Sequence, residues 1–342
     1  RRQRQRSGST LLGWESHTVK AHERTEAYLH DLGALAPTMN PNDLLLAEIT
    51  SAYDVDPDGA LGGGGGSGGG GSGGLGEGAS ATVRRAMHRD TGRPVAIKAI
   101  SKRYLFTQAE QAGADREMVN QRRLCHRHVV RLYETYETDT ELFLVLERAT
   151  CGSLDDLLFV RRRLTELEAK IVLKQVLDAV QYCHAQGLQS SPLSISGLVV
   201  KLCDFGHSRK VPDVKYFKYT GDIHKIPHHL FQHTGTQGYI SPEILLQNSY
   251  GKAADMWSCG VLMHKLLSGA VPWNSPRGCL QEPLALKARL WNDISDEAKD
   301  LLRGLLEVDQ ELRLSASQAL NHAWFAGIEH CTAMPTYAPG GR

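Results

Sequence analysis

Residues 75–98 read LGEGASATVRRAMHRDTGRPVAIK, a glycine-rich turn that leads into a strand-like run ending in a lysine. Gly76 and Gly78 allow the backbone of such a turn to approach a ligand closely, because a glycine has no Cβ in the way. The run RPVAIKAI alternates like a half-buried strand, which would hold Lys98 rigidly below the turn. This combination indicates a site for the phosphates of a nucleotide, with the Lys98 ammonium as their counter-charge.

Four further segments follow in order along the chain. KLCDFG contains Asp204, and GTQGYISPE ends in Glu243. YGKAADMWSCGVL contains Asp255, and VDQELRLSASQALNHAWF contains Arg313. Together with the glycine-rich turn, these motifs resemble the eukaryotic protein-kinase family, and within it the calcium/calmodulin-dependent group of Ser/Thr kinases.

The resemblance implies the two-lobed α+β kinase fold over residues 75–325. A small β-sheet lobe with one helix would extend to about Ala149, and a larger helical lobe would follow it. The pattern G-T-x-x-Y-x-x-P-E around Thr236 favours Ser/Thr over Tyr as the phosphorylated residue. We therefore expect transfer of the γ-phosphoryl group of Mg-ATP to a protein, with ATP and Mg²⁺ as cofactors.

The resemblance also implies roles for single residues. Lys98 would pair with Glu117 of the segment AGADREMVNQRRL, for which Glu110 is a less favoured substitute. Asp204 would bind Mg²⁺. The residues expected around ATP are Leu75, Gly76, Gly78, Val83, Ala96, Lys98, Glu117, Leu146, Glu147 and Ala149.

Other residues are implied to shape the site or the lobe that carries it. Leu146 would be the gatekeeper at the end of the strand in ELFLVLERA, and residues 147–149 would offer backbone groups to adenine. In the helical lobe, Glu243 would form an ion pair with Arg313. Asp255 would lie on a buried helix that anchors the lobe.

The catalytic loop expected of this family is missing from the sequence. The family needs H-R-D-L-x-x-x-N before D-F-G, because its Asp accepts the substrate proton and its Asn binds a second Mg²⁺. Between His184 and Asp204 the chain reads AQGLQSSPLSISGLVVKLC, which contains no Asp, Glu, Asn or His. We therefore assign no catalytic base and expect impaired transfer. The chain would be either a pseudokinase scaffold or an active kinase that has lost an exon, in the organism or only in the gene model.

The parts outside residues 75–325 are expected to be separate from the domain. Residues 1–60 would form a partly disordered N-terminal region, and GGGGGSGGGGSGG gives residues 61–74 the composition of a flexible Gly/Ser linker. Residues 326–342 would be a disordered tail. Because the chain begins at Arg1 and not at Met, we expect a fragment or an incomplete gene model.

One motif in the N-terminal region suggests calcium. Asp54, Asp56 and Asp58 precede Gly59 in the pattern D-x-D-x-D-G, which is typical of the start of an EF-hand loop. The twelfth position should carry a glutamate but is Gly65. The segment would therefore be either a degenerate calcium loop in a calcium-responsive adaptor or an acidic turn before the linker, and the turn is favoured.

Composition limits the partners. The chain has 342 residues, is 41% hydrophobic and has a formal net charge of +1. A net charge this close to zero predicts no general electrostatic attraction to nucleic acid or to a membrane surface. Its seven cysteines are scattered without a C-x-x-C pair, a pattern that favours reduced thiols. We expect a cytoplasmic or nuclear protein that is not secreted, with a protein substrate or a scaffold partner.

Overall fold

The computed structural model describes residues 41–60, 81–104, 118–149, 153–189, 195–196, 199–203, 209–210, 238–246, 251–275, 277–286 and 289–328. These residues belong to two compact units. The first contains a β-sheet with the helix α2, and the second contains residues 118–131 and the helices from α4 onward. Within the described residues, no helix is both long and apolar enough to span a bilayer.

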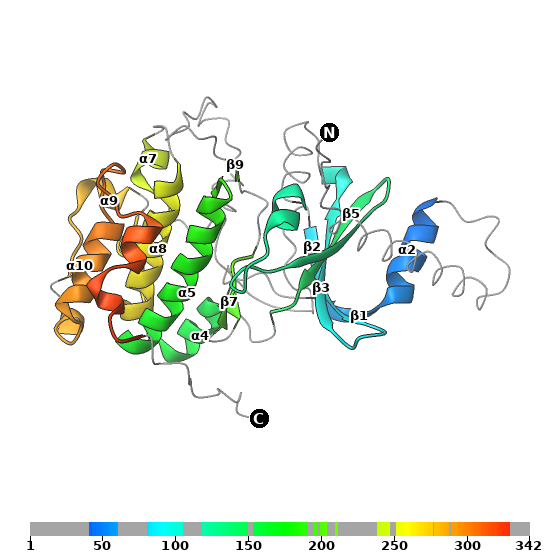
Figure 1. The fold of residues 1–342 in the computed structure, drawn as a ribbon, viewed down its shortest axis with the longest axis horizontal. Coiled ribbons are helices and arrows are strands. Elements are labelled where there is room, and N and C mark those ends of the chain that lie inside the picture. Colours follow the sequence, from blue (N-terminus) through cyan, green and yellow to red (C-terminus); the bar gives the residue numbers. More distant parts are fainter. Residues whose placement is uncertain are drawn as a thin grey trace, which may run out of the picture. The chain divides into compact units, whose positions relative to one another are not determined.

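The sheet of the first unit has five antiparallel strands (Figure 1). In the order in which they lie side by side, they are β1 (Tyr53–Ala60), β2 (Ala81–His88), β3 (Pro94–Ser101), β5 (Glu141–Glu147) and β4 (Leu132–Glu137). The helix α2 (Pro41–Ala52) leads directly into β1, and the 3-10 helix η2 (Lys102–Tyr104) follows β3.

Strand β3 shows which side chains lie on each face of this sheet. Val95 and Ile97 are buried on one face, in a cluster that also contains residues of α2 and β5. Ala96 and Lys98 alternate with them and therefore lie on the opposite face. The alternation predicted from RPVAIKAI is thus the pleat of a strand that is central in the sheet.

The structure corrects the expectation for residues 53–60. Neither a calcium loop nor an acidic turn forms there, because Tyr53, Asp54 and Val55 pair with the successive β2 residues His88, Met87 and Ala86. The expected boundary at residue 60 therefore falls inside the sheet. The predicted linker, residues 61–74, lies outside the described residues. The predicted tail, residues 326–342, starts too early, because residues 326–328 are described and Ile328 is buried. The rest of this tail lies outside the described residues.

The second unit is built from helices. They are α4 (Leu154–Arg161), α5 (Glu166–Ala185), α7 (Pro242–Leu245), α8 (Lys252–Ser268), α9 (Gly278–Gln281), α10 (Asp296–Leu305) and α11 (Ala316–Leu320), with the 3-10 helices η4 (Arg289–Trp291) and η5 (Ala323–Phe325). Residues 118–123 are also helical. Two short antiparallel pairs accompany the helices: β6 (Leu188–Gln189) with β9 (Arg209–Lys210), and β7 (Ile195–Ser196) with β8 (Val199–Val200).

The starts of the helices follow from local sequence. Thr165 accepts a hydrogen bond from the Glu168 backbone N–H, and the Glu168 carboxylate accepts one from the Thr165 backbone in return. Ser153 and Asp156 form the same reciprocal cap at the start of α4. Each cap satisfies backbone donors that the first turn of a helix leaves unpaired.

The core of the second unit lies between α5 and α8, which are adjacent in Figure 1. On α5, Leu173 and Leu177 are fully buried, and on α8 the ring of Trp257 stacks on Trp273 with their centroids 5.5 Å apart. Because both helices are apolar on the sides that meet, each fixes the position of the other. Polar residues on these two helices are therefore held in defined positions.

Candidate active site

The residues predicted around ATP in the sheet lie together on one face. Val83 of β2 is opposite Lys98 of β3, and Lys98 is opposite Leu144 of β5. Ala96 is opposite Leu146. Cross-strand partners in an antiparallel sheet share a face, as do residues two apart on one strand. Among these five residues, Lys98 is the charged one and the other four are apolar.

This face is chemically suited to a nucleotide. Ala96 is buried, whereas Val83, Lys98 and Leu146 are half-buried and so retain exposed surface. Apolar side chains can cover a base while an ammonium group at the same face neutralises phosphate. Glu147 and Ala149, at the end of β5 and just beyond it, are also half-buried.

Five predicted site residues cannot be placed. Leu75, Gly76, Gly78, Glu117 and Asp204 lie outside the described residues. Their roles therefore remain predictions.

The segment that leads to Asp204 is described. Val129 and Leu202 form a parallel bridge, in which the Leu202 backbone N–H donates to the His128 carbonyl at 2.8 Å. The Val200 N–H donates to Oε1 of Gln175 at 3.0 Å, which attaches the same segment to α5. Residues 199–203 are therefore fixed immediately before Asp204.

Glu243 and Arg313 form the predicted ion pair. The Arg313 Nη1 and Nη2 atoms donate to the two Glu243 carboxylate oxygens at 2.7 and 2.9 Å, and both side chains are almost fully buried. The guanidinium also donates to the carbonyls of Ala253 and Glu307, each at 2.8 Å, and it lies 5.1 Å from the ring centroid of Trp257. The pair thus joins α7, α8 and the segment after α10.

Asp255 has a partner that the sequence did not reveal. Its Oδ2 atom lies 2.7 Å from Nε2 of His184, and both side chains are about nine-tenths buried. His184 is at the end of α5 and Asp255 is near the start of α8, so the contact links these two helices. His184 directly precedes residues 185–203, in which the sequence offers no catalytic base. No spacing rule connects two residues on different helices. The sequence could therefore predict the helix of each residue but not their contact.

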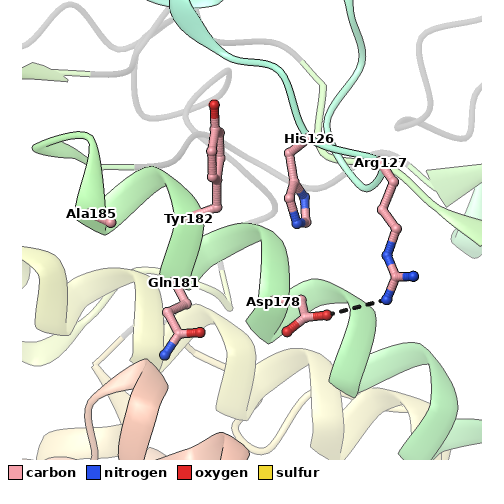
Figure 2. A pocket seen from close by; sticks show the side chains of 6 residues that line it. All are labelled: His126, Arg127, Asp178, Gln181, Tyr182 and Ala185. Carbon is pink, nitrogen blue, oxygen red and sulfur yellow. Dashed lines mark ion pairs between the residues drawn. The ribbon is translucent and has the colours of Figure 1, made fainter.

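The second unit also contains a surface pocket of about 590 Å³ (Figure 2). Its walls come from α5 and from the connection before β4, and the lining residues are His126, Arg127, Asp178, Gln181, Tyr182 and Ala185. His126 and Tyr182 stack with their ring centroids 5.0 Å apart, and Arg127 lies 3.6 Å from the Asp178 carboxylate. None of the residues predicted from the sequence lines this pocket.

The electrostatics of the pocket disfavour a charged histidine. Burial lowers the pKa of His126, and the positive charges of Arg127 and Lys201 lower it further against the opposing effect of Asp178. A neutral imidazole stacked on a tyrosine is a packing contact more than a reactive group.

The comparisons with known proteins agree with the order of the motifs. Residues 72–325 match the model of the protein kinase domain. The chain belongs to the protein-kinase family. More narrowly, it belongs to the eukaryotic Ser/Thr protein kinases, in the group similar to the calcium/calmodulin-dependent kinases. Its α+β architecture is accordingly the predicted two-lobed kinase fold.

Several curated kinases are similar to the chain. Calcium/calmodulin-dependent protein kinase type 1 of Macrobrachium nipponense is 35% identical over 268 residues, which cover 74% of this chain and 73% of that protein. The serine/threonine-protein kinase H1 homolog of Danio rerio is 33% identical, with 76% and 62% covered. Probable serine/threonine-protein kinase fhkC of Dictyostelium discoideum is 32% identical, and the matched region spans only 44% of its length. The chain thus spans less than two thirds of the last two relatives.

Proposed function

We propose that this domain binds Mg-ATP on the sheet face that carries Lys98 and that its transfer of phosphate to protein Ser or Thr is impaired. The observation that supports binding is the register that brings Val83, Ala96 and Leu146 to the same face as Lys98. The Lys98 ammonium would neutralise the phosphates, and the apolar side chains would cover the base. Bound Mg²⁺ would neutralise further phosphate charge, with Asp204 as its ligand.

The proposal of impaired transfer rests on residues 185–203. They contain no Asp, Glu, Asn or His, so they offer neither a group that can accept the substrate proton nor the second metal ligand. Strand β6 ends at Gln189 and β7 begins at Ile195, so only residues 190–194 connect them. Lys98 and its neighbours can position the donor, but they cannot orient the acceptor.

The same observation favours one alternative, a pseudokinase that acts as a scaffold for a protein partner. It would bind a partner with or without ATP and transfer no phosphate. We do not propose a calcium-responsive adaptor, because Asp54 and Asp56 lie in strand β1. Asp54 also forms an ion pair with Arg89 at 3.5 Å.

The cytoplasmic or nuclear location stays a proposal. The cysteines of the described residues are in no disulfide, which suits a reducing compartment; they are Cys125, Cys183, Cys203, Cys259 and Cys279.

The test of nucleotide binding is a thermal-unfolding series with Mg-ATP. We expect the full chain to unfold at a higher temperature in millimolar Mg-ATP, since a ligand that binds only the folded state stabilises it. Lys98→Met should abolish this shift, whereas Lys102→Met, which removes a lysine just after the same strand, should retain it. If the unchanged chain shows no shift, the binding proposal fails.

A further inference from the structure

The last turn of α4 exposes two consecutive apolar side chains. Phe159 is 90% exposed and Val160 is 72% exposed, more than any other large apolar side chain of the described residues. The helix is anchored without them, because Leu154 and Leu158 are buried in the core of the second unit. Phe159 and Val160 therefore contribute little to folding and are available to a partner.

Three arginines follow these two side chains directly, and all three are exposed. The Arg161 guanidinium donates to both Glu168 carboxylate oxygens, at 2.6 and 3.1 Å. Among the described residues, none forms a hydrogen bond or an ion pair with the side chain of Arg162 or Arg163. Two unpaired positive charges therefore follow the exposed apolar pair.

The carboxylates nearest in the chain do not balance these two charges, because each is engaged elsewhere. The four carboxylates of residues 153–170 have the following partners: Lys265 for Asp155, Ser153 for Asp156, Ser295 and Trp324 for Glu166, and Arg161 and Thr165 for Glu168. Arg162 and Arg163 therefore lack a counter-charge from their own surroundings. Their charge is complementary to acidic groups from outside the domain.

The backbone of Arg162 shows that an arginine at this position is strained. Its φ is 65°, and among the described residues Arg162 is the one residue other than glycine with a positive φ. Glycine adopts this region readily, whereas a residue with a Cβ does so at a cost. Strain of this kind persists where surrounding contacts enforce it, and it is common at functional sites. An arginine in a position that favours glycine thus adds to the unpaired charge as an indication that the guanidinium is used.

The turn that carries Arg162 is held firmly on its neighbours. The Arg162 N–H donates to the Leu158 carbonyl at 2.7 Å, and the Leu164 N–H donates to the Leu266 carbonyl of α8 at 2.8 Å. Gly269, at the end of α8, leaves room for the turn, because a Cβ there would collide with the Arg162 carbonyl oxygen. A rigid surface loses little conformational entropy on binding, which favours docking.

A protein segment fits this surface better than an anionic membrane does. Asp155 and Asp156 are exposed and lie four and three residues before Phe159, so they share its face of α4. A flat anionic bilayer that reached Phe159 would therefore also meet these two carboxylates, which it repels. A peptide can place its acidic groups opposite Arg162 and Arg163 and away from the two aspartates.

We propose that Phe159, Val160, Arg162 and Arg163 form a docking surface for a partner protein whose docked segment carries an apolar residue next to acidic residues. The apolar residue packs on Phe159 and Val160, and its acidic neighbours bind the two arginines. Aromatic and arginine side chains are the residues that most often dominate binding energy at protein interfaces. This docking goes beyond the proposed function and needs no nucleotide, because the four residues belong to the second unit and not to the sheet that carries Lys98.

The first experiment searches for the docked segment with defined peptides. The full chain, without nucleotide, is applied to an array of short peptides in which acidic, basic, apolar and polar residues are varied independently. We expect it to bind peptides that combine several Asp or Glu residues with Leu or Phe, and not peptides with only one of these features. The affinity for the best peptide is then measured by fluorescence anisotropy. If the chain binds no peptide, or if binding does not depend on the acidic residues, the proposal fails.

The second experiment assigns this binding to the surface. Phe159→Ser and Arg162→Gly should each weaken the affinity about tenfold or more, since truncating a central aromatic or arginine residue of an interface often has an effect of this size. Arg162→Gly should also leave the unfolding temperature unchanged or raise it, because relief of strain offsets the greater entropy of glycine in the unfolded chain. A loss of binding without a loss of stability is not expected of a purely structural arginine.

The matched controls change exposed residues elsewhere on the same unit. Leu312→Ser removes an apolar side chain that is 71% exposed, and Arg303→Ala removes an exposed arginine in the last turn of α10. Both variants should bind the peptide like the unchanged chain. If they weaken binding as much as Phe159→Ser and Arg162→Gly, or if those two variants bind normally, the docking surface is not at α4.

Sedimentation with vesicles separates a membrane from a protein partner. Vesicles of phosphatidylserine and phosphatidylcholine should bind the chain no better than vesicles of phosphatidylcholine alone. Binding to the anionic vesicles that is lost in Phe159→Ser and Arg162→Gly would overturn the proposal, because the surface would then bind a membrane. These measurements contain no nucleotide, so a failure of Mg-ATP binding would count against the proposed function and not against the docking surface.

Discussion

Arg313 uses all five N–H donors of its guanidinium inside the helical unit. The group contacts Glu243, 70 residues earlier in the chain, and backbone carbonyls from α8 and from the segment after α10. A buried pair of this kind is worth little compared with a well-packed apolar pair, but removing one partner leaves the other charge buried alone. The consequence is a large asymmetry between single and double substitution.

We predict that Arg313→Met destabilises the domain by about 3–5 kcal/mol. The double variant Glu243→Leu with Arg313→Met should recover much of this loss, since it leaves no unpaired charge. Asp296→Ala removes the exposed partner of Lys299 and should cost about 0–1 kcal/mol. Urea unfolding measures all three variants, and a cost for Arg313→Met no larger than that of Asp296→Ala would contradict the prediction.

Some positions and contacts of single residues could be predicted from the sequence, and others could not. Glu243 and Arg313 could be paired in advance because each occupies a fixed place in a recognised motif, and the structure pairs them. Lys98 could be placed on a strand because its neighbours alternate. The contact of Asp255 with His184 could not be predicted, because it depends on how α5 packs on α8.

Among the elements, α5 is fixed at its start by a carboxylate that joins three helices. The Glu166 carboxylate accepts hydrogen bonds from the backbone N–H and hydroxyl of Ser295, before α10, and from Nε1 of Trp324 in η5. Burial alone would raise the pKa of Glu166, but the hydrogen bonds from Ser295 and Trp324 and the charge of Lys170 outweigh burial and lower it.

This lowered pKa predicts a defined contribution to acid unfolding. A carboxyl group with a folded-state pKa below its unfolded value stabilises the fold above the unfolded pKa and loses that contribution as the pH falls through the folded pKa. Glu166→Gln should therefore lower stability at pH 7 and flatten its decline below about pH 4.5, the ordinary value. Unfolding free energies from pH 3 to 7 test this. If the unfolding free energy falls equally with decreasing pH in the variant and the unchanged chain, the prediction is contradicted.

Strand β1 shows where prediction of elements from the sequence fails. Aspartate, proline and glycine are rare in strands, and YDVDPDGA contains all three, so its pattern indicates a turn or a calcium loop. Tyr53 and Val55 do alternate toward the sheet core, and that period of two was the available signal. Burial of Tyr53 against the cluster outweighs the low strand propensity of its neighbours.

At the scale of the whole molecule, the order of the motifs identified the fold because each belongs to a fixed place in it. Composition could not place the N-terminal boundary, since a glycine tract has the same sequence in a tether between domains and in a connection within a sheet. That difference depends on the pairing of strands on either side of the tract. The described part of the chain provides this pairing through β1 and β2.

Catalysis depends on which groups of the whole site survive. We predict that the chain transfers phosphate to protein far more slowly than a competent kinase. Replacing residues 190–194, between β6 and β7, with H-R-D-L-K-P-E-N should restore transfer. Lys98 can still neutralise the phosphates of the donor. The aspartate of the insert would add a positioned base, which contributes about 10²–10⁴-fold to the rate of transfer. The measurement is radiolabelled transfer to a basic Ser/Thr peptide. The matched control is the same insert with its aspartate changed to asparagine, which should remain slow. Strong activity of the original chain that is lost in Asp204→Ala would contradict the prediction, because its catalytic groups would then lie outside residues 185–203.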